Sequence, residues 1–536
     1  MNPNQRSADM ESLATAEEIQ SQPWRRWLTP DGKAPLALPS VSERLEYAQW
    51  PDKYPGLREA IVEWNAYSEP ERERLHHRAR RLTRPALRFG HLGRAGRIVG
   101  EIVRVFGEMI LVDTAPTVIL SRTEGEDAGK AHISEEAARR IREAFVRLGP
   151  TFVKFGQLIA ASRGVLPDEI VETFAPCRDE VPPFDFEIVR ETIEEELGEK
   201  LEDLFSEFDE EPIAAASIAQ VHGAVLRDGT EVVVKVQRPN IAERIRRDIE
   251  VLSDAVMLMN LATDKFRQAN IPGVIRLFAE TVNEELDFRL EADNMCEVAV
   301  GLELLGIESV YAPHPIPDMV TRRVLVMERL RGHKFNDVES IKRSGIQTED
   351  LIRNSIKAVV EGATVAGIFH GDLHSGNVMI LPDGRFGLMD FGIVARMNRT
   401  RRDSLIRFLV SLATDNMEGM IDSFAEFDAF PYGFDREALL DDLARHAEAR
   451  AEQRLDELTM DEFLDGFAET IRIIGSHGAY VPKDMVMFLK NLIYLNEATQ
   501  VLAPHINLLS EVTEVFTYFK GKYGEQMEEI AGSVMG

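Results

Sequence analysis

The sequence predicts an α+β protein in which strands gather in two places and helices occupy most of the rest. The first β-rich stretch, residues 217–239, consists of two runs separated by Asp228-Gly229, and the second, residues 378–389, is divided by Asp383-Gly384. Asp-Gly between apolar runs is a strong signal for a tight hairpin turn. Stretches with helical periodicity surround both hairpins. They cover residues 134–175, 184–208, 273–305 and 349–367, and helices continue from about Asn398.

The composition is that of a globular chain with an acidic surface. Of its 536 residues, 44% are hydrophobic, enough to form the cores of about two to four domains. The formal net charge is −29 at pH 7. This balance disfavours nucleic acid as a partner, because phosphate backbones are bound by clustered Lys and Arg.

Cysteine usage and hydropathy indicate a reducing compartment and no membrane span. The two cysteines, Cys177 and Cys296, lack the spacing of zinc ligands and predict no disulfide. The start of the chain, MNPNQRSADMESLATAEEIQ, has no apolar core of the kind found in signal peptides. No apolar run reaches transmembrane length. We therefore expect a cytoplasmic protein whose membrane contact, if any, is peripheral.

The amino-terminal part divides by composition into two segments. Residues 1–72 mix Pro, Trp and both charges without a period, which predicts a loosely structured extension. Residues 73–133 begin with an Arg-rich block that continues as an amphipathic helix, which favours an anionic membrane surface or an acidic partner. The alternative is a helix packed on the main domain with its arginines in solvent. Its apolar face consists of Ile98, Val99, Ile102, Val103, Val105, Phe106, Met109 and Ile110.

The stretch FHGDLHSGNVMILPDGRFGLMDFG, residues 369–392, carries the strongest signal for chemistry. Asp372 is followed five residues later by Asn377, and Asp390 begins a DFG triplet. In phosphoryl transfer one Asp orients the nucleophile, while an Asn and another Asp hold magnesium against the phosphates. The predicted hairpin would bring Asn377 and Asp390 to the same edge. The alternative is a surface hairpin with solvated acids, but H-x-D-x-x-x-x-N followed by DFG is a specific pattern.

The first hairpin offers groups suited to nucleotide phosphates. Lys235 lies near the end of its second strand, where a lysine can contact phosphates if a Glu from a neighbouring helix holds it. Without such a partner it is an ordinary edge-strand lysine. Small residues that precede the hairpin would let the backbone approach a phosphate closely, although a packed turn is the alternative. These are Ala214, Ala215, Ala216 and Ser217.

Two helical stretches and one strand complete the pattern. In LGPTFVKFGQ, residues 148–157, a Lys, a Gly and a Gln interrupt an apolar helical face, and a lysine there can also extend its ammonium group to solvent. In the helical stretch NEELDFRLEADN, Asp287 and Glu291 are four residues apart and share one face. VLVME, residues 324–328, reads as a buried strand before a connector suited to a hinge.

With these motifs in place, the chain resembles the UbiB family of atypical, protein-kinase-like ATPases. The resemblance covers roughly residues 135–510 and rests on LGPTFVKFGQ, PIAAASIAQVH, VVVKVQRP, EELDFRLEADN, FHGDLHSGN and DFG in that order. A KxGQ segment together with an Ala-rich loop is specific to that family among kinase-like proteins. The resemblance implies a bilobal protein-kinase-like fold with helical additions. Its KxGQ helices and amino-terminal lobe would occupy residues 134–328, and its carboxy-terminal lobe residues 329–536.

The resemblance also implies roles for the candidate residues. Lys235 would contact the nucleotide phosphates, with Glu291 as its counter-ion. Asp372 would be the catalytic-loop acid, and Asn377 and Asp390 would hold magnesium. The remaining nucleotide-binding positions would be Ala214, Ala215, Ala216, Ser217, Met327 and Glu328.

The KxGQ segment would have a regulatory role. By the resemblance, Lys154, Gly156 and Gln157 fold across the place where a protein substrate would dock. Glu285 and Asp287 form the ExD partner of this motif. Protein phosphorylation would then be disfavoured relative to ATP hydrolysis or transfer to a small acceptor.

The resemblance implies a Mg²⁺-dependent protein that binds ATP or ADP and supports isoprenoid-quinone or other lipid metabolism at membranes. Its expected partners are a nucleotide, a lipid or isoprenoid-quinone precursor, and an anionic membrane surface. Gly371, Leu373 and Ser375 depart from the Ala and Pro residues that many relatives carry around the catalytic Asp. Residues 515–536 also lack the membrane spans that end some relatives.

Two other functions remain open from the sequence. HGDLHxGN also resembles the aminoglycoside and choline phosphotransferases, which favours a small-molecule kinase. That function explains the catalytic loop but neither the KxGQ segment nor the Ala-rich loop. A pseudokinase that binds nucleotide or lipid as a scaffold is the second alternative, which the intact Lys, acids and Asn disfavour.

Overall fold

The computed structural model describes most of the chain after residue 40. The described residues are 41–83, 96, 100–101, 135–160, 174, 181–262, 271–335, 337–413, 416–427, 429–430, 434–448, 462, 470, 473–474, 477 and 482–523. They belong to two compact units assembled from alternating segments. Unit 1 takes those in Met1–Glu63, Asp293–His314 and Leu330–Gly536, and unit 2 takes those in Trp64–Ala292 and Pro315–Arg329. The two lobes that the resemblance implies, residues 134–328 and 329–536, are contiguous segments, whereas each of these units combines segments from different parts of the chain.

Unit 2 is built on an antiparallel sheet with strand order β1-β3-β4-β7-β6, to which the short strand β2 adds by pairing with β3. The predicted hairpin around Asp228-Gly229 is confirmed, with Ala219 opposite Gln237 and Val225 opposite Glu231. The predicted strand VLVME is also confirmed as β7. The strands are β1 (Phe205–Phe208), β2 (Ala214–Ala215), β3 (Ala219–Leu226), β4 (Glu231–Gln237), β6 (Pro315–Val320) and β7 (Val324–Glu328).

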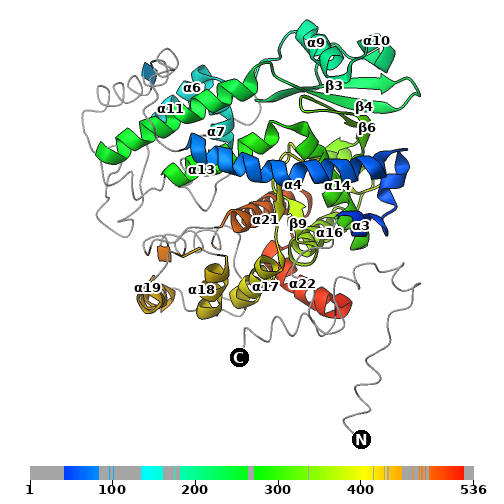
Figure 1. Ribbon diagram of the computed structural model, residues 1–536. Helices are drawn as coiled ribbons and strands as arrows, with labels where there is room; N and C mark the ends of the chain where they lie inside the picture. The colour runs from blue at the N-terminus through cyan, green and yellow to red at the C-terminus, as the bar shows by residue number, and fades with distance from the viewer. Residues whose placement is uncertain are drawn as a thin grey trace, which may run out of the picture. The chain divides into compact units, whose positions relative to one another are not determined.

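The two faces of this sheet have different roles. Val232, Val234 and Val236 of β4 are fully buried and pack in a core with the helices α9 and α10, which lie over the sheet in Figure 1. Because successive side chains of a strand point to opposite faces, Lys235 lies on the face away from this core. The helices are α9 (Phe186–Leu197) and α10 (Leu201–Leu204).

The remaining helices of unit 2 differ from the sequence prediction in two places. The stretch predicted as one helix over 273–305 is two helices, α13 (Ile271–Glu285) and α14 (Phe288–Leu304), and α14 continues into unit 1 from Asp293. Residues 205–208, predicted as helical, form strand β1 because Phe205 and Phe208 pair with β3. Also present are α6 (Glu135–Leu148), α7 (Pro150–Ala160) and α11 (Ile241–Ala262).

Unit 1 is mainly helical, with two small sheets. In one, β10 pairs with β11 as the predicted hairpin around Asp383-Gly384, with Val378 opposite Leu388. In the other, β12 pairs with β9, with Val394 opposite His370. The strands are β5 (Val310–Tyr311), β8 (His333–Lys334), β9 (Ile368–His370), β10 (Val378–Ile380), β11 (Phe386–Leu388) and β12 (Val394–Arg396).

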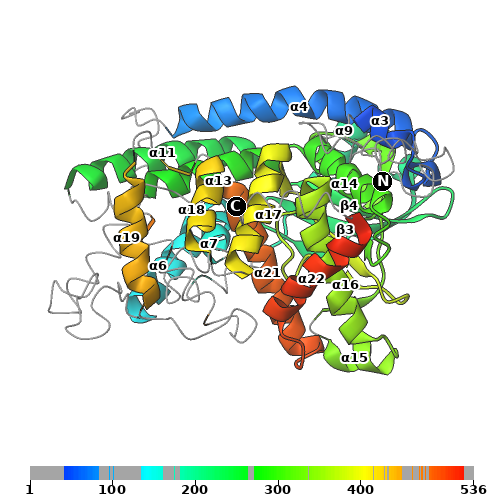
Figure 2. The ribbon, with the colours of Figure 1, turned by 90° about the horizontal axis from the view of Figure 1, so that it is seen from below.

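Three helices of unit 1, α16, α21 and α22, pack against one another (Figure 2). Helix α16 (Thr348–Glu361) runs on into a π-helical turn, η5 (Gly362–Ala366), before β9 begins. Helix α21 (Lys483–Leu502) is buried along most of its length. The other helices are α3 (Val41–Leu45), η2 (Trp50–Lys53), α15 (Val338–Arg343), α17 (Arg399–Ala413), α18 (Met417–Glu426), α19 (Arg436–Glu448) and α22 (Leu508–Tyr523).

The amino-terminal predictions have mixed outcomes. The loosely structured extension predicted over 1–72 is wrong for residues 57–72, which belong to the helix α4 (Leu57–Leu82). Its apolar residues Leu57, Ile61 and Trp64 are buried at helical spacing, which stabilises the helix despite Pro70. The apolar face predicted for 98–110 lies outside the described residues. No helix among the residues that the structure describes is long and apolar enough to cross a membrane.

Gly367 fixes the geometry at the point where the chain enters β9. It ends the helical segment in the left-handed conformation, with φ +68°. A Cβ at this position would lie 2.5 Å from the Met397 carbonyl oxygen and 2.7 Å from the Arg402 Cδ. The close approach is maintained by the hydrogen bond from the Met397 amide to the Gly367 carbonyl, 2.7 Å. Only glycine satisfies both constraints.

We predict that Gly367→Ala destabilises the protein more than Gly56→Ala does. Gly56 also has a positive φ, +78°, but its Cβ would meet no atom within 4 Å. The Gly56 variant should therefore show the backbone strain alone, about 1–2 kcal/mol. The Gly367 variant should lose at least about 1 kcal/mol more, because overpacking adds its own cost. Urea denaturation of both variants measures the difference, and equal losses would contradict this role for Gly367.

Candidate functional site

Lys235 and Glu291 form a buried ion pair in unit 2. The Lys235 Nζ lies 2.6 Å from Glu291 Oε1 and 2.9 Å from Oε2. The two side chains are only 8% and 2% exposed. The ammonium group also lies 5.3 Å from the centre of the Phe288 ring. Because an isolated charge is very costly to bury, each of these side chains depends on the other. Lys235 is therefore not the solvated edge-strand lysine of the alternative interpretation.

Glu291 is positioned by the start of α14. Asp287 precedes the helix, and its Oδ1 accepts a hydrogen bond from the Arg289 amide at 3.2 Å, as an N-capping side chain does. The chain between α13 and α14 is attached to β4 as well, since Gln237 donates to the Leu286 carbonyl at 3.0 Å. The expectation that Asp287 and Glu291 share one helical face is wrong, because Asp287 lies in the break between two helices.

The KxGQ segment forms part of α7, and its lysine contacts the ExD segment at one of the two expected acids. Lys154 Nζ lies 2.6 Å from Glu285 Oε2, and both groups are largely buried. Asp287 has other partners than those predicted: Tyr67 donates to it at 2.7 Å and Arg289 at 2.7 Å. Burial and the hydrogen bond to Asp287 raise the pKa of Tyr67 to about 12. Gly156 and Gln157 follow Lys154 in the same helix.

The Ala-rich loop is a tight hairpin between β2 and β3. Ala214 and Ala215 pair with β3, and the Ala216 amide donates to the Ala219 carbonyl at 2.8 Å. Arg238 holds the turn from the side by donating to the Ala216 carbonyl at 2.9 Å. The three alanines are exposed or half-buried, but Ser217 is buried. The loop is therefore a packed turn, as in the alternative interpretation, and its small alanine side chains are also exposed or half-buried. Met327 and Glu328 end β7 of the same sheet, opposite Val233 and Val232.

In unit 1, His370 joins the catalytic-loop motif to the DFG motif. The Asp372 amide donates to His370 Nδ1 at 3.0 Å, so the ring proton is on Nε2, which donates to the Asp390 carbonyl. Burial lowers the pKa of His370, which keeps the ring neutral. A backbone hydrogen bond also joins the two motifs, because the Gly371 amide donates to the Ile393 carbonyl at 2.9 Å.

Helix α21 holds the catalytic loop through two residues that the sequence analysis did not single out. Lys490 Nζ lies 2.6 Å from Asp372 Oδ1, with the two side chains 12% and 20% exposed. Asn491 is buried, accepts from the Leu373 amide at 3.3 Å and donates to the His370 carbonyl. No local motif predicts this contact, since both residues follow the loop by more than a hundred positions. The sequence feature that could have indicated them is a lysine and an asparagine within an otherwise apolar helical stretch.

Asn377 and Asp390 lie at the same end of the β10–β11 hairpin, as predicted. The Met389 amide donates to the Asn377 carbonyl at 2.9 Å, so Asp390 directly follows the residue paired with Asn377. The Asn377 amide group donates to the Asp372 carbonyl at 3.0 Å, which directs its side-chain oxygen away from the loop. Asp390 Oδ1 accepts from the Gly392 amide at 2.9 Å. The hairpin therefore presents one carboxamide oxygen and one carboxylate.

This pair of oxygen donors fits magnesium bound together with phosphates. Mg²⁺ prefers oxygen ligands and usually takes one or two carboxylates, with the rest of its coordination from water and substrate phosphates. Among the described residues, no group of three or more His, Cys, Asp or Glu side chains is arranged to hold a metal ion alone. Asn377 and Asp390 could supply two ligands of such an ion, with water and phosphate oxygens as the others.

Comparison with known proteins identifies the family. Residues 176–424 match the ABC1 atypical kinase-like domain. The chain is 32% identical over 396 residues to an aarF domain-containing protein kinase of the Arabidopsis thaliana chloroplast, described as uncharacterized, and the match covers 69% of this chain and 73% of the relative. The chain belongs to the UbiB family of atypical kinase-like proteins. Its α+β kinase-like fold class, predicted from sequence, is confirmed.

Bacterial proteins are also among the relatives of this UbiB-family chain. The probable protein kinase UbiB of Pseudomonas aeruginosa is 35% identical over 276 residues, which is 51% of each chain. An uncharacterized Mycobacterium tuberculosis protein is 32% identical over 379 residues, or 70% of this chain and 77% of the relative. A solved structure, the complex of Mycobacterium tuberculosis Rv3197 with erythromycin, matches with a TM-score of 0.40 and 24% identity, covering 65% of this chain and 90% of the other.

We predict that Lys235→Met lowers the free energy of unfolding by about 3–5 kcal/mol, because it leaves the Glu291 carboxylate buried without its counter-ion. The double variant Lys235→Met/Glu291→Leu should recover much of this loss, since it removes both charges. Lys200→Met is the matched control, because Lys200 is exposed and should change stability by less than about 0.5 kcal/mol. Urea denaturation tests all three. A Lys235→Met loss no larger than the control would contradict the coupling.

Proposed function

We propose that this chain binds a magnesium nucleotide and uses it for ATP hydrolysis or for phosphoryl transfer to a small acceptor. The buried Lys235–Glu291 pair is the observation that carries the proposal. In the kinase fold, such a pair between a central strand and a helix positions the lysine for the nucleotide phosphates. A buried ion pair is seldom retained for stability alone, because a hydrophobic pair of similar volume is often as stable.

The catalytic loop supplies the other groups that this reaction needs. Asp372 would orient the nucleophile, either water or the hydroxyl of an acceptor, and accept its proton. Lys490, 2.6 Å from Asp372, favours the ionised carboxylate that this role requires. Bound magnesium would neutralise charge on the phosphates, with Asn377 and Asp390 as its protein ligands. The neutral His370 holds the loop and the DFG backbone in register.

A small acceptor is proposed rather than a protein. The Lys154–Glu285 ion pair anchors the KxGQ helix to the ExD segment, which supports a fixed regulatory element in this family. The alanines of the β2–β3 hairpin also have less backbone freedom than the glycines of a phosphate-clamping loop. We further propose that the acceptor or activator belongs to lipid or isoprenoid-quinone metabolism. The Arg-rich segment after residue 72 would bring the protein to an anionic membrane surface.

The binding of a magnesium nucleotide is the first test. We predict that wild-type protein is stabilised by ATP or ADP in the presence of Mg²⁺, by about 2.7 kcal/mol when the nucleotide is at a hundred times its Kd. Asp390→Asn should weaken this stabilisation, because a carboxylate ligand to the metal becomes a neutral amide. Asp383→Asn, at the exposed turn of the same hairpin, is the matched control. A thermal-shift titration with each nucleotide, with and without Mg²⁺, measures this stabilisation in all three proteins. Absence of any magnesium-dependent shift in the wild type would overturn the assignment.

The pH dependence of ATP turnover tests the catalytic pair. Asp372→Asn should abolish turnover. Lys490→Met should retain part of it, but with the acidic limb of the pH profile moved to higher pH, because the carboxylate loses the cation that favours its ionised form. Lys483→Met, on the same helix two turns earlier, should leave the profile in place. An unchanged acidic limb in the Lys490 variant would show that this lysine acts only on stability.

A further inference from the structure

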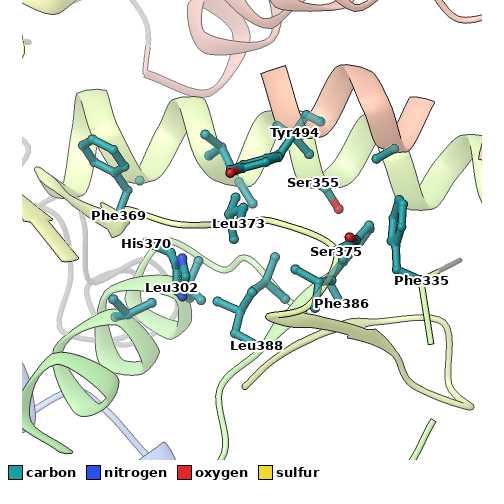
Figure 3. Close-up of a pocket in the computed structure, with 18 of the residues that line it drawn as sticks. Leu302, Phe335, Ser355, Phe369, His370, Leu373, Ser375, Phe386, Leu388 and Tyr494 are labelled. Atoms are coloured by element: carbon teal, nitrogen blue, oxygen red, sulfur yellow. The ribbon is translucent and has the colours of Figure 1, made fainter. Parts of the chain in front are cut away.

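A largely apolar cavity lies beside the catalytic loop, entirely within unit 1 (Figure 3). It encloses about 740 Å³ of empty space, including its open mouth. Three helices, α14, α16 and α21, contribute to its wall together with the strands β9, β10 and β11. Small residues, among them Ala358 and Ala498, leave room for it where larger side chains would fill the space.

Two polar side chains of the lining, those of Ser355 and His370, are already hydrogen-bonded to the protein. Ser355 donates to the Leu351 carbonyl at 2.8 Å. His370 uses both ring nitrogens, one toward the Asp372 amide and one toward the Asp390 carbonyl. A polar ligand group buried beside them would lose its bonds to water, which is costly. The part of a ligand that packs against this wall is therefore best a hydrocarbon.

The mouth of the cavity limits the charge of the ligand. Ser375 and Glu497, both exposed, are among its lining residues, and Glu497 is the charged residue in that lining. No lysine or arginine lines the cavity within the part of the chain that the structure describes. A carboxylate or phosphate at the mouth would meet repulsion from Glu497, whereas a hydroxyl group can bond to Ser375 or to water. An uncharged head group fits best.

The wall of the cavity is continuous with the groups that hold the catalytic acid. Leu373, whose side chain lines the cavity, directly follows Asp372 in the chain. Tyr494 and Leu495 line it from α21, the same helix that carries Lys490 and Asn491. A ligand in the cavity would therefore pack on both partners of the Lys490–Asp372 ion pair through their neighbours.

We propose that this cavity binds an uncharged amphiphile, with a short hydrocarbon chain or ring inside and a hydroxyl group at the mouth. Occupancy holds the catalytic loop against α21 and so favours the placement of Asp372. Binding of the amphiphile is inferred from the cavity alone. The effect of the amphiphile on ATP turnover rests on the proposed function as well.

Binding is tested on the full chain without nucleotide, so that its outcome is independent of catalysis. The probes are hexanol and hexanoate, which share a hydrocarbon chain and differ in charge. Saturation-transfer NMR should detect hexanol, and hexanoate should bind more weakly by about tenfold or more. Ala358→Leu and Ala498→Leu should each fill part of the cavity and abolish hexanol binding. Ala444→Leu, at an exposed helical position, is the matched control and should bind as the wild type does.

Each filled variant is used only if its thermal unfolding is as cooperative as that of the wild type. This check excludes loss of binding through misfolding. Hexanol binding that survives in both, or equal binding of hexanoate, would overturn the proposal. Turnover of ATP is then measured with and without hexanol. An increase in the wild type and in Ala444→Leu, absent from the filled variants, supports the coupling. Binding without any effect on a measurable turnover would overturn the coupling, and absence of turnover in all proteins would instead refute the proposed function.

Discussion

The Lys235–Glu291 ion pair is a buried interaction on which several elements of unit 2 depend. Two full charges are tolerated at this depth only because their atoms lie within 2.9 Å of each other. This requires the alternation of β4, which places valines toward α9 and the lysine on the opposite face. It also requires α14 to begin where Asp287 caps it. Glu285, two residues before that cap, pairs with Lys154 of α7, so the break between α13 and α14 serves both ion pairs.

Unit 1 depends in a similar way on the helix α21. Its residues Lys490 and Asn491 hold the side chain of Asp372 and the backbone on either side of it. The helix α14 also contributes, because the Asn294 side chain donates to the Phe391 carbonyl at 2.7 Å and its oxygen accepts from Arg396 at 2.6 Å. The catalytic motif and the DFG motif are therefore fixed by residues that lie far from them in the sequence, and the loop itself needs no regular secondary structure.

Both predicted hairpins followed from local sequence signals. Asp-Gly turns and short apolar runs predicted both hairpins because turn geometry and strand pairing are decided by neighbouring residues. The pairing of Lys235 with Glu291 came from the family resemblance, since nothing in VVVK specifies a partner 56 residues later. Lys490, Asn491 and the partners of Asp287 were missed because long-range side-chain contacts leave no periodic trace. The first part of the helix α4, residues 57–72, was missed because its mixed charges and Pro70 obscured three buried apolar residues.

We propose that Asn377 and Asp390 hold a divalent cation on the phosphates of a nucleotide. Crystals grown with Mn²⁺ and a non-hydrolysable ATP analogue test this, since Mn²⁺ shares the oxygen ligands of Mg²⁺ and scatters anomalously. We expect an anomalous peak about 2.0–2.2 Å from Asn377 Oδ1 and from the Asp390 carboxylate, with the analogue's phosphates completing the coordination. A bound analogue whose metal contacts neither residue would contradict it.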